Sequence, residues 1–283
     1  MSKLTIKALY KFKQRGEKIC MITAYDYPTA RIVDKAGIEI ILVGDSVGTN
    51  VLGYRSEKEV TLSDILHHTK AVVRGTERAF VIADMPFMSY HTDAATAIQN
   101  AGRLLQEAKA DAIKCECRGK LFENVKAIIE AGIPTMGHIG LTPQTSFDMT
   151  SKGRTLSEAL DIIKMAQKLE EIGAFALLLE KVPLRLADLI MDMVHIPVIG
   201  IGASPLCDGQ VLVIHDILNL SAIQFKHAKV YRDIEKEITC ATQAYIQEVK
   251  AQHFPDDENC FSMSDEVFNE VKSQLQATHH SKQ

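Results

Sequence analysis

The sequence predicts an α/β fold, a single (β/α)8 TIM barrel, and two observations support this prediction. Short apolar runs of strand length alternate with amphipathic helical patterns, and eight strand candidates can be counted. No linker or shift in composition divides the 283 residues, so we expect one domain over residues 1–283. A doubly wound open sheet is the alternative. However, the glycine run at residues 200–205 lacks the third glycine of a dinucleotide fingerprint, and no βαβ unit follows it.

The first half of the chain contains an opening helix and four strand–helix units. Lysines alternate with Ile6, Leu9 and Phe12, which predicts an N-terminal amphipathic helix at residues 5–15 that caps one end of the barrel. Thr61, with Asp64 three residues later, predicts the start of another helix. Strands are expected at residues 19–23, 38–43, 80–83 and 112–115, and further helices at 27–36, 62–74, 93–108 and 121–131.

The second half repeats this order with one irregularity. Strands are expected at residues 135–138, 176–179, 198–202 and 210–215, and helices at 155–172 and 183–194. Between the last two strands there is room for little more than a turn. Two C-terminal helices are expected at 233–253 and 265–275, and the tail at 276–283 is expected to be disordered.

The composition argues against several classes of protein. The formal net charge is −4 and no block of Lys or Arg is present, so nucleic acid is not expected as a ligand. No apolar run approaches membrane-spanning length, and the N-terminus lacks the apolar core of a secretory signal. We therefore expect a cytoplasmic enzyme without a membrane partner. The six cysteines have no paired CxxC spacing and are expected to be reduced.

Three successive strand candidates end at an acidic residue, namely Asp45, Asp84 and Glu116. The carboxyl ends of parallel barrel strands meet at one rim, so we expect these three side chains to converge. Carboxylate oxygens suit Mg²⁺, and an acid cluster without a cation would repel itself. The sequence therefore predicts one Mg²⁺ per subunit, held by Asp45, Asp84 and Glu116.

Other strand candidates also end at polar residues. Asp26 follows the first strand, but a single acid at such a place is more often a helix cap than a site residue. Lys114 shares a strand face with Glu116, and His138 ends the fifth strand. Either residue alone could be structural, yet both would lie on the rim that carries the acids. Glu180 ends the sixth strand and could face the metal site across the mouth, as a general base should.

Six segments resemble the ketopantoate hydroxymethyltransferase family. They are TAYDY (23–27), LVGDS (42–46), ADMPFM (83–88), GHIGLTPQ (137–144), PVIGIGA (197–203) and DGQVLVIHD (208–216). The resemblance extends from about residue 5 to about residue 261, and this set of motifs in this order is highly specific.

The resemblance implies a barrel of the phosphoenolpyruvate/pyruvate superfamily, assembled as a homodecamer. It also implies transfer of a hydroxymethyl group from 5,10-methylenetetrahydrofolate to 3-methyl-2-oxobutanoate, which gives ketopantoate for pantothenate and coenzyme A synthesis. By this resemblance Glu180 falls on the catalytic base and His138 on a supporting residue. The Mg²⁺-associated acids are Asp45, Asp84 and Glu116, and the ketoacid contacts are Asp45, Ser46, Asp84 and Lys114.

Three segments depart from the family pattern. The loop at residues 145–154 is shorter than usual and lacks a Gly-Gly-Tyr segment, and in the family this loop lies near the mouth of the active site. Residues 223–227 replace the usual Pro-Lys-Phe, and residues 258–261 replace the usual Glu-His-Ser-Phe. These changes could alter folate binding or assembly contacts.

Two alternative functions stay open on the sequence alone. One is another metal-enolate reaction on the same barrel, such as a lyase or mutase, although the Lys-Lys-Cys-Gly-His lid segment of those relatives is absent here. The other is a divergent paralogue without catalysis, which the shortened loop would favour.

Overall fold

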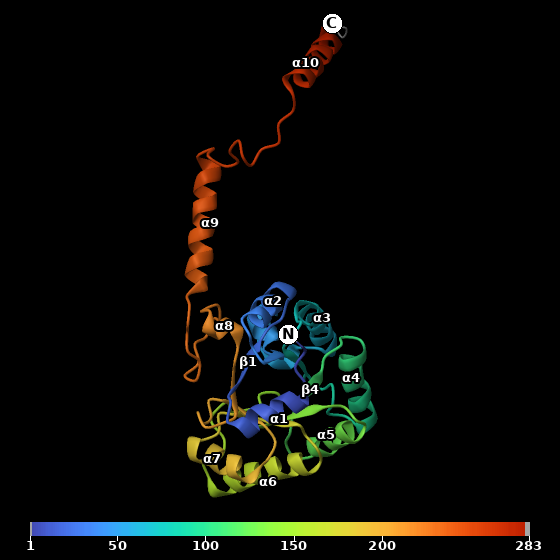
Figure 1. The fold of residues 1–283 in the computed structure, drawn as a ribbon, viewed down its shortest axis with the longest axis vertical. Helices are drawn as coiled ribbons and strands as arrows, with labels where there is room; N and C mark the ends of the chain where they lie inside the picture. Colours follow the sequence, from blue (N-terminus) through green and yellow to red (C-terminus); the bar gives the residue numbers. More distant parts are fainter. Residues whose placement is uncertain (1, 281–283) are drawn as a thin grey trace. The chain divides into compact units, whose positions relative to one another are not determined.

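The computed structural model describes residues 2–280, with side chains described as far as Gln276 (Figure 1). The chain divides into two compact units, Met1–Arg232 and Asp233–Gln283. This differs from the single domain over residues 1–283 that we expected. The reason is that the sheet closes on itself before residue 233, so the barrel is complete within the first unit.

Eight parallel strands form a closed barrel in which each strand pairs with the next and β8 pairs with β1, as predicted. The strands are β1 (Ile19–Thr23), β2 (Ile40–Val43), β3 (Phe80–Asp84), β4 (Ala112–Glu116), β5 (Thr135–Gly140), β6 (Ala176–Glu180), β7 (Val198–Ile201) and β8 (Gly209–Leu212). Parallel strands of this kind are buried on both faces, which explains their continuous apolar runs.

Helices cover the outside of the barrel (Figure 1). The α-helices of the first unit are α1 (Ile6–Arg15), α2 (Tyr27–Lys35), α3 (Leu62–Gly75), α4 (Ala94–Gln106), α5 (Leu121–Glu130), α6 (Leu156–Glu171), α7 (Leu184–Met193) and α8 (Ile214–Ile217). A π-helical turn, η1 (Gly48–Leu52), and a 3₁₀ turn, η2 (Glu57–Glu59), precede α3. Thr61 and Asp64 form the predicted capping box at the start of α3.

The region around β8 differs from our prediction. The strand expected at residues 210–215 ends at Leu212, and His215 lies in the short helix α8. The chain leaves the sheet here because the backbone N–H of Ile214 donates a hydrogen bond to Oγ1 of Thr23 on β1. The predicted absence of a helix between β7 and β8 is correct, since residues 202–208 form only turns and bends.

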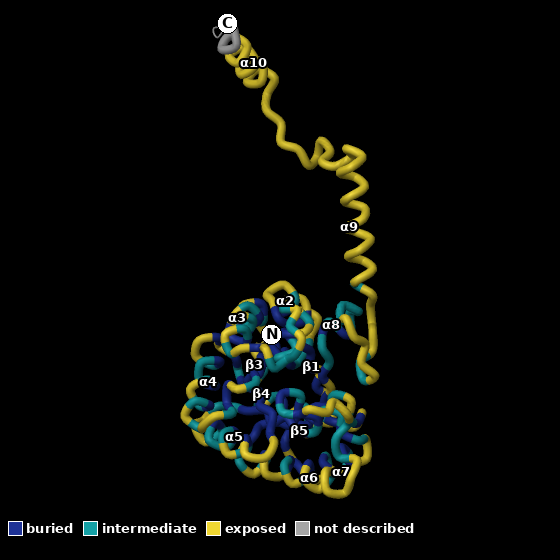
Figure 2. Tube along the Cα trace, turned by 180° about the vertical axis from the view of Figure 1, so that it is seen from behind, coloured by how far each residue is buried: buried dark blue, intermediate teal, exposed yellow. Residues whose placement is uncertain are grey.

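Apolar side chains form two clusters, one inside the barrel and one between the strands and the helices. Figure 2 shows that the buried residues concentrate along the strands. The inner cluster includes Met21, Ile40, Leu42, Phe80, Ile82, Met136, Phe175, Leu178, Ile199 and Val211. Leu9 of α1 is fully buried in the same cluster, so α1 caps the barrel as predicted. The outer cluster packs strand residues such as Val81 and Leu177 against Val72 of α3 and Leu169 of α6.

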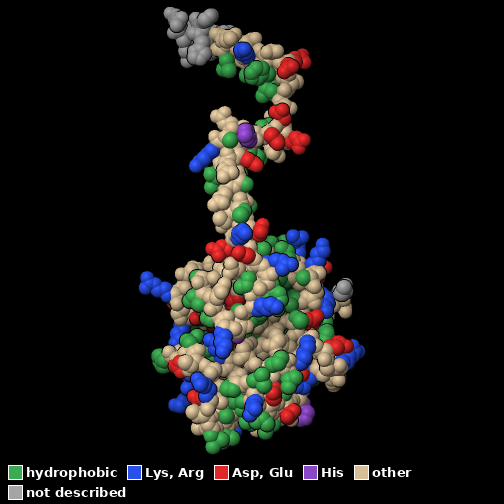
Figure 3. Space-filling view, turned by 90° about the vertical axis from the view of Figure 1, so that its left-hand side faces the viewer, with side chains coloured by type: hydrophobic (Ala, Val, Ile, Leu, Met, Phe, Trp, Pro, Cys, Tyr) green, Lys and Arg blue, Asp and Glu red, His purple; other side chains and the backbone are tan. Residues whose placement is uncertain are grey.

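The second unit contains two helices, α9 (Ile234–Lys250) and α10 (Asp265–His280). Helix α10 extends into the segment that we expected to be disordered, and residues 281–283 lie outside the described residues. Within the described part of the chain, no helix has both the length and the apolar character needed to cross a membrane. On the face of the first unit seen in Figure 3, Lys and Arg side chains are scattered among acidic and apolar ones.

Candidate active site

A cavity of about 150 Å³ opens at the carboxyl ends of the barrel strands. The structure brings together there all the site residues predicted from the sequence, namely Asp45, Ser46, Asp84, Lys114, Glu116, His138 and Glu180. Asp26 is not among them. Its carboxylate instead caps α2 by accepting hydrogen bonds from the backbone N–H and the hydroxyl of Thr29, at 2.7 and 3.0 Å.

The parallel register explains why these side chains meet. Asp84 on β3 is paired with Lys114 on β4, and Glu116 is paired with His138 on β5. Side chains two residues apart in a strand point the same way, so Lys114 and Glu116 face the cavity together. Gly140, at φ +95°, is paired with Glu180, and a Cβ atom on it would lie 2.4 Å from the carbonyl oxygen of Glu180. Glycine is therefore required beside this acid.

Asp84 and Lys114 form a buried ion pair in the cavity. Lys114 Nζ lies 2.7 Å from Oδ1 of Asp84, and the two side chains are 6% and 0% exposed. The backbone N–H of Asp45 donates to the other oxygen, Oδ2 of Asp84, at 3.2 Å. This bond holds the turn after β2 against the end of β3 and so places Asp45 next to Asp84.

Burial raises the pKa values of two carboxyl groups in the cavity. Burial raises the pKa of Asp84 to about 7, although Lys114 acts in the opposite direction. Burial also raises the pKa of Glu116 to about 8, again against the effect of Lys114. For Lys114, burial alone would lower the pKa, but the carboxyls of Asp84, Asp45 and Glu116 outweigh it and raise the pKa above its usual value. Lys114 is therefore a cation at neutral pH.

Gln144 connects the acidic residues, a role that sequence reasoning missed. It is fully buried, its backbone N–H donates to Oε1 of Glu116 at 3.0 Å, and its Nε2 donates to Oδ2 of Asp45 at 2.9 Å. Nε2 also donates to the carbonyl oxygen of Met85, and the hydroxyl of Tyr90 donates to Oε1 of Gln144. The only sequence signal was its position in the matching segment GLTPQ.

His138 stands between Lys114 and Glu180. Lys114 Nζ lies 3.5 Å from Nδ1 of His138, and Nε2 of His138 lies 3.3 Å from Oε2 of Glu180. Burial, with help from Lys114, lowers the pKa of His138, so the imidazole is neutral at pH 7. Because an ammonium group can only donate, Nδ1 acts as the acceptor and the imidazole proton lies on Nε2, the nitrogen that faces Glu180.

Glu180 is ionised at neutral pH. Burial alone would raise its pKa, but the contact with His138 and the charges of Lys114 and Lys181 outweigh burial and hold the pKa below its usual value. Glu180 therefore differs from Asp84 and Glu116, whose pKa values are raised. Carboxyl groups in one site whose pKa values move in opposite directions are typical of separate acid–base roles.

The donor set fits a divalent cation such as Mg²⁺. Asp45, Asp84 and Glu116 offer hard oxygen ligands, and the raised pKa values of Asp84 and Glu116 show that full ionisation needs more positive charge than Lys114 supplies. Among the described residues, no three carboxyl, imidazole or thiol groups are close enough together to hold an ion by themselves. Direct contact of a metal with all three acids thus stays a prediction. Of the three acids, Asp45 and Asp84 are the two that contact each other.

The short loop at residues 145–154 lies at the mouth of the cavity. Met149 lines the cavity together with Pro143. The backbone N–H of Lys152 donates to the carbonyl oxygen of Lys181 at 3.2 Å, and Lys181 Nζ donates to the carbonyl oxygen of Met149 at 3.5 Å. The loop is therefore attached to the end of β6, directly after Glu180.

The raised pKa of Glu116 predicts how the stability of the metal-free protein depends on pH. The unfolded chain loses this proton near pH 4.5 and the folded chain near pH 8, so the folded state binds an extra proton between these values. Stability therefore falls as pH rises through this window, by about 5 kcal/mol at most for this group. In urea unfolding with a chelator, the stability of the wild type relative to Glu116→Gln should fall between pH 5 and pH 8. A difference independent of pH would contradict this account.

Comparison with known proteins assigns the chain to a family. The family model described as ketopantoate hydroxymethyltransferase matches residues 3–257. The chain belongs to this family. Curated relatives include the 3-methyl-2-oxobutanoate hydroxymethyltransferases of Acetivibrio thermocellus, 48% identical over 95% of this chain and 96% of the relative, and of Dehalococcoides mccartyi, 49% identical over 95% and 96%. That of Carboxydothermus hydrogenoformans is 46% identical over 96% of this chain and all of the relative. The chain is thus an enzyme of the ketopantoate hydroxymethyltransferase family, as the six segments indicated.

Solved structures confirm the fold. Phosphonopyruvate hydrolase superposes with a TM-score of 0.60 at 12% identity, over 99% of both chains. A second structure of phosphonopyruvate hydrolase, in complex with oxalate and Mg²⁺, gives a TM-score of 0.56 at 14% identity, over 99% of both chains. A 2,3-dimethylmalate lyase, a member of the PEP mutase/isocitrate lyase superfamily, gives 0.59 at 14% identity, over 96% of this chain and 95% of that one. The ketopantoate hydroxymethyltransferase family shares the barrel with these proteins, and at such identities the likeness concerns the fold alone.

Proposed function

We propose that this enzyme transfers a hydroxymethyl group from 5,10-methylenetetrahydrofolate to 3-methyl-2-oxobutanoate and so forms ketopantoate. The observation that carries the proposal is the ionised Glu180 in the same small cavity as the Asp45–Asp84–Lys114 group. Glu180 can accept a proton from carbon, and the Asp45–Asp84–Lys114 group can bind the oxygens of a small 2-oxoacid. The two together suit a reaction in which such an acid loses a proton from carbon. Membership of the ketopantoate hydroxymethyltransferase family supports the same reaction.

Glu180 is the general base of the proposed mechanism. It removes the proton from C3 of the ketoacid, and the electron pair of the broken C–H bond moves toward the ketone oxygen. His138 is a positioning residue, because the Nε2 proton facing Oε2 of Glu180 holds the carboxylate in one orientation and favours its charged form. Because its pKa is lowered, Glu180 is deprotonated at neutral pH and can accept the proton from C3.

Lys114 and Ser46 bind the negative charge of the ketoacid. The ammonium group of Lys114 already faces Asp84 and His138 and lines the cavity. The hydroxyl oxygen of Ser46 lies 2.7 Å from the hydroxyl oxygen of buried Tyr25, which fixes its direction. Donors held in place before the substrate arrives stabilise a developing oxyanion without reorganising.

Asp45 and Asp84 would hold Mg²⁺, and water and the substrate itself would complete its coordination, which is the usual arrangement for this ion. A bound Mg²⁺ would polarise the ketone and make the C3 proton more acidic. Glu116 is held by Gln144 and by the hydroxyl of Thr145, at 3.0 and 3.3 Å. In this proposal Glu116 adds negative charge close to the ion.

The carbon–carbon bond then forms between C3 of the deprotonated ketoacid and the methylene carbon of the folate. That carbon arrives at the oxidation level of formaldehyde, so no electron donor or acceptor is needed. Both C–N bonds that join this carbon to the folate break, water supplies the hydroxyl oxygen, and the two protons of the water go to the two nitrogens as tetrahydrofolate leaves. The proton that Glu180 took from C3 completes the new hydroxyl group. The chain contributes the base, the anion contacts and a small cavity that holds the reacting carbon.

The family membership carries two further proposals. We propose assembly as a homodecamer, and a cytoplasmic enzyme that serves pantothenate and coenzyme A synthesis. Sedimentation of the purified protein tests the first of these directly.

The proposed activity has a direct test. Purified protein with Mg²⁺, 3-methyl-2-oxobutanoate and methylenetetrahydrofolate should produce ketopantoate, measured by mass spectrometry, and omission of either substrate should abolish it. Proton exchange at C3 without any ketopantoate would favour another metal-enolate reaction. Absence of both would favour a paralogue without catalysis.

A further inference from the structure

A proton that Glu180 takes from carbon must leave the carboxyl group before the base can act again, and two close neighbours cannot carry it. The Nε2 nitrogen of His138 that faces Glu180 already bears a proton, and its Nδ1 faces the ammonium group of Lys114. Lys114 is itself a cation. Both neighbours are also buried, with His138 3% and Lys114 4% exposed. They position Glu180 but do not connect it to water.

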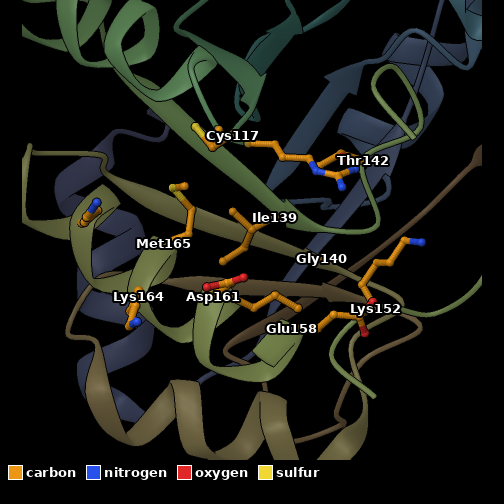
Figure 4. A pocket seen from close by; sticks show the side chains of 13 residues that line it. Cys117, Ile139, Gly140, Thr142, Lys152, Glu158, Asp161, Lys164 and Met165 are labelled. Carbon is orange, nitrogen blue, oxygen red and sulfur yellow. The ribbon is translucent and has the colours of Figure 1, made fainter. Parts of the chain in front are cut away.

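The flank of the barrel offers no route either. A cavity of about 460 Å³ lies there, lined by the ends of β4 and β5 and by helix α6 (Figure 4). None of the described residues that line it also lines the mouth cavity. The buried hydrogen bonds from Gln144 and Thr145 to the carboxyl group of Glu116 close the passage between the turns after β4 and β5. The remaining wall beside Glu180 is formed by the end of β7 and the segment after α8.

His227, in the segment after α8, lies against the strand next to Glu180. Ile201 on β7 is paired with Glu180, and Gly202 follows Ile201. A Cβ atom added to Gly202 would lie 3.1 Å from Cβ of His227, so the lack of a side chain at Gly202 lets this segment approach the end of β7. His227 and Glu180 line the same cavity. The imidazole is therefore part of the wall beside the base.

The ring of His227 is held in place and also reaches solvent. It stacks on the ring of Phe225, with the centroids 5.5 Å apart and the planes inclined by 19°. The ammonium group of Lys181 lies over the Phe225 ring, 5.6 Å from its centroid. His227 is half-buried, whereas His138 is buried. Its imidazole can therefore exchange protons with water.

The charged groups around His227 leave it neutral and able to accept a proton. Burial and the charge of Lys181 lower its pKa, against the opposite effects of Glu180 and Asp216. The ordinary pKa of histidine is about two units above that of glutamic acid. The pKa of Glu180 is lowered too, which favours release of a proton from its carboxyl group. Proton transfer from protonated Glu180 to neutral His227 is thus favourable.

We propose that His227 carries the C3 proton to and from Glu180. Protonated Glu180 gives its proton, through water in the cavity, to the free nitrogen of the neutral imidazole and becomes a carboxylate again. With the ketoacid alone, the imidazolium gives a proton to solvent water. In the complete reaction it gives the proton to the oxygen of the new hydroxyl group. This inference rests on the proposed function, since it takes Glu180 as the base of that reaction.

The test is C3 proton exchange by His227→Ala in deuterated water, followed by NMR with Mg²⁺ and the ketoacid and without folate. The exchange rate should fall about tenfold or more. The KM for the ketoacid should stay within about twofold of the wild type, because the ketoacid contacts are intact. Imidazole added to the buffer should restore exchange, since it can enter the space left by the ring and accept the proton from Glu180.

His227→Phe separates a proton relay from a packing role. Phenylalanine keeps a ring beside Phe225 but cannot carry a proton, so exchange should stay as slow as in His227→Ala. Added imidazole should not restore it, because the ring fills the space. The control His195→Ala removes a histidine side chain that is 94% exposed and lies outside the described lining of the cavity. It should exchange the C3 proton at the wild-type rate.

The outcomes separate this inference from the proposed function. Wild-type exchange in His227→Ala or in His227→Phe would overturn the relay and leave Glu180 as the base. Slow exchange in His227→Ala that imidazole does not restore would also overturn it. A wild type that exchanges the C3 proton but forms no ketopantoate would refute the proposed transfer, and the same variants would still decide the relay. No exchange by the wild type would overturn both.

Discussion

Replacement of Glu180 with glutamine is expected to slow proton exchange at C3 of 3-methyl-2-oxobutanoate by about 100-fold to 10,000-fold. Glutamine keeps the shape of the side chain but cannot accept the proton. Mg²⁺ affinity should stay within about twofold of the wild type, because the adjacent acids Asp45 and Asp84 are untouched. The measurement is loss of the C3 proton in deuterated water, followed by NMR, with Mg²⁺ and without folate.

The control for this variant is Glu171→Gln, an exposed carboxylate at the end of α6. It should exchange the C3 proton at the wild-type rate. Unchanged exchange in Glu180→Gln would remove Glu180 from the role of base. Unchanged exchange together with a raised KM for the ketoacid would instead make Glu180 a substrate contact.

Replacement of Asp84 with asparagine is expected to have two large effects. Lys114 would remain in a buried place without its partner, which should lower the free energy of unfolding by about 3 kcal/mol. The loss of one carboxylate of the Asp45–Asp84 pair should weaken Mg²⁺ binding by at least about tenfold. Urea unfolding and calorimetric Mg²⁺ titration measure the two effects separately.

Asp26→Asn is the matched control, because Asp26 also follows a barrel strand but caps a helix instead of lining the cavity. Asparagine is a good N-cap, so stability and Mg²⁺ affinity should change little. Wild-type Mg²⁺ affinity in Asp84→Asn would show that the ion is held elsewhere. A free energy of unfolding in Asp84→Asn equal to that of the wild type would show that the ion pair between Asp84 and Lys114 contributes little to stability.

The barrel could be predicted because its strands are buried on both faces and its helices begin at recognisable caps. Phe80–Asp84 and Ala112–Glu116 were evident as apolar runs that end at an acid. Thr61 with Asp64 marked the start of α3. The end of β8 was missed, because the bond from Ile214 to Thr23 that draws the chain away from the sheet joins residues far apart in sequence.

The site could be predicted only in part. Strand register places Lys114 opposite Asp84 and Glu116 opposite His138, so their meeting at one rim followed from the order of the strands. The role of Gln144 could not be foreseen, since it depends on a backbone N–H that meets Glu116 and a side chain that meets Asp45. Pattern alone also could not separate Asp26 from Asp45. Each follows a strand, and only the structure shows that one accepts hydrogen bonds from its own helix.

The measurement that tests the account most directly is C3 proton exchange by the wild-type protein with the ketoacid alone. It needs the base, the anion contacts and the metal, but no folate. We predict that 3-methyl-2-oxobutanoate loses its C3 proton to deuterated water in the presence of Mg²⁺ and that a chelator stops the exchange. No exchange above the rate without enzyme, at saturating ketoacid and Mg²⁺, would contradict the claim that these strand ends form a proton-abstracting site.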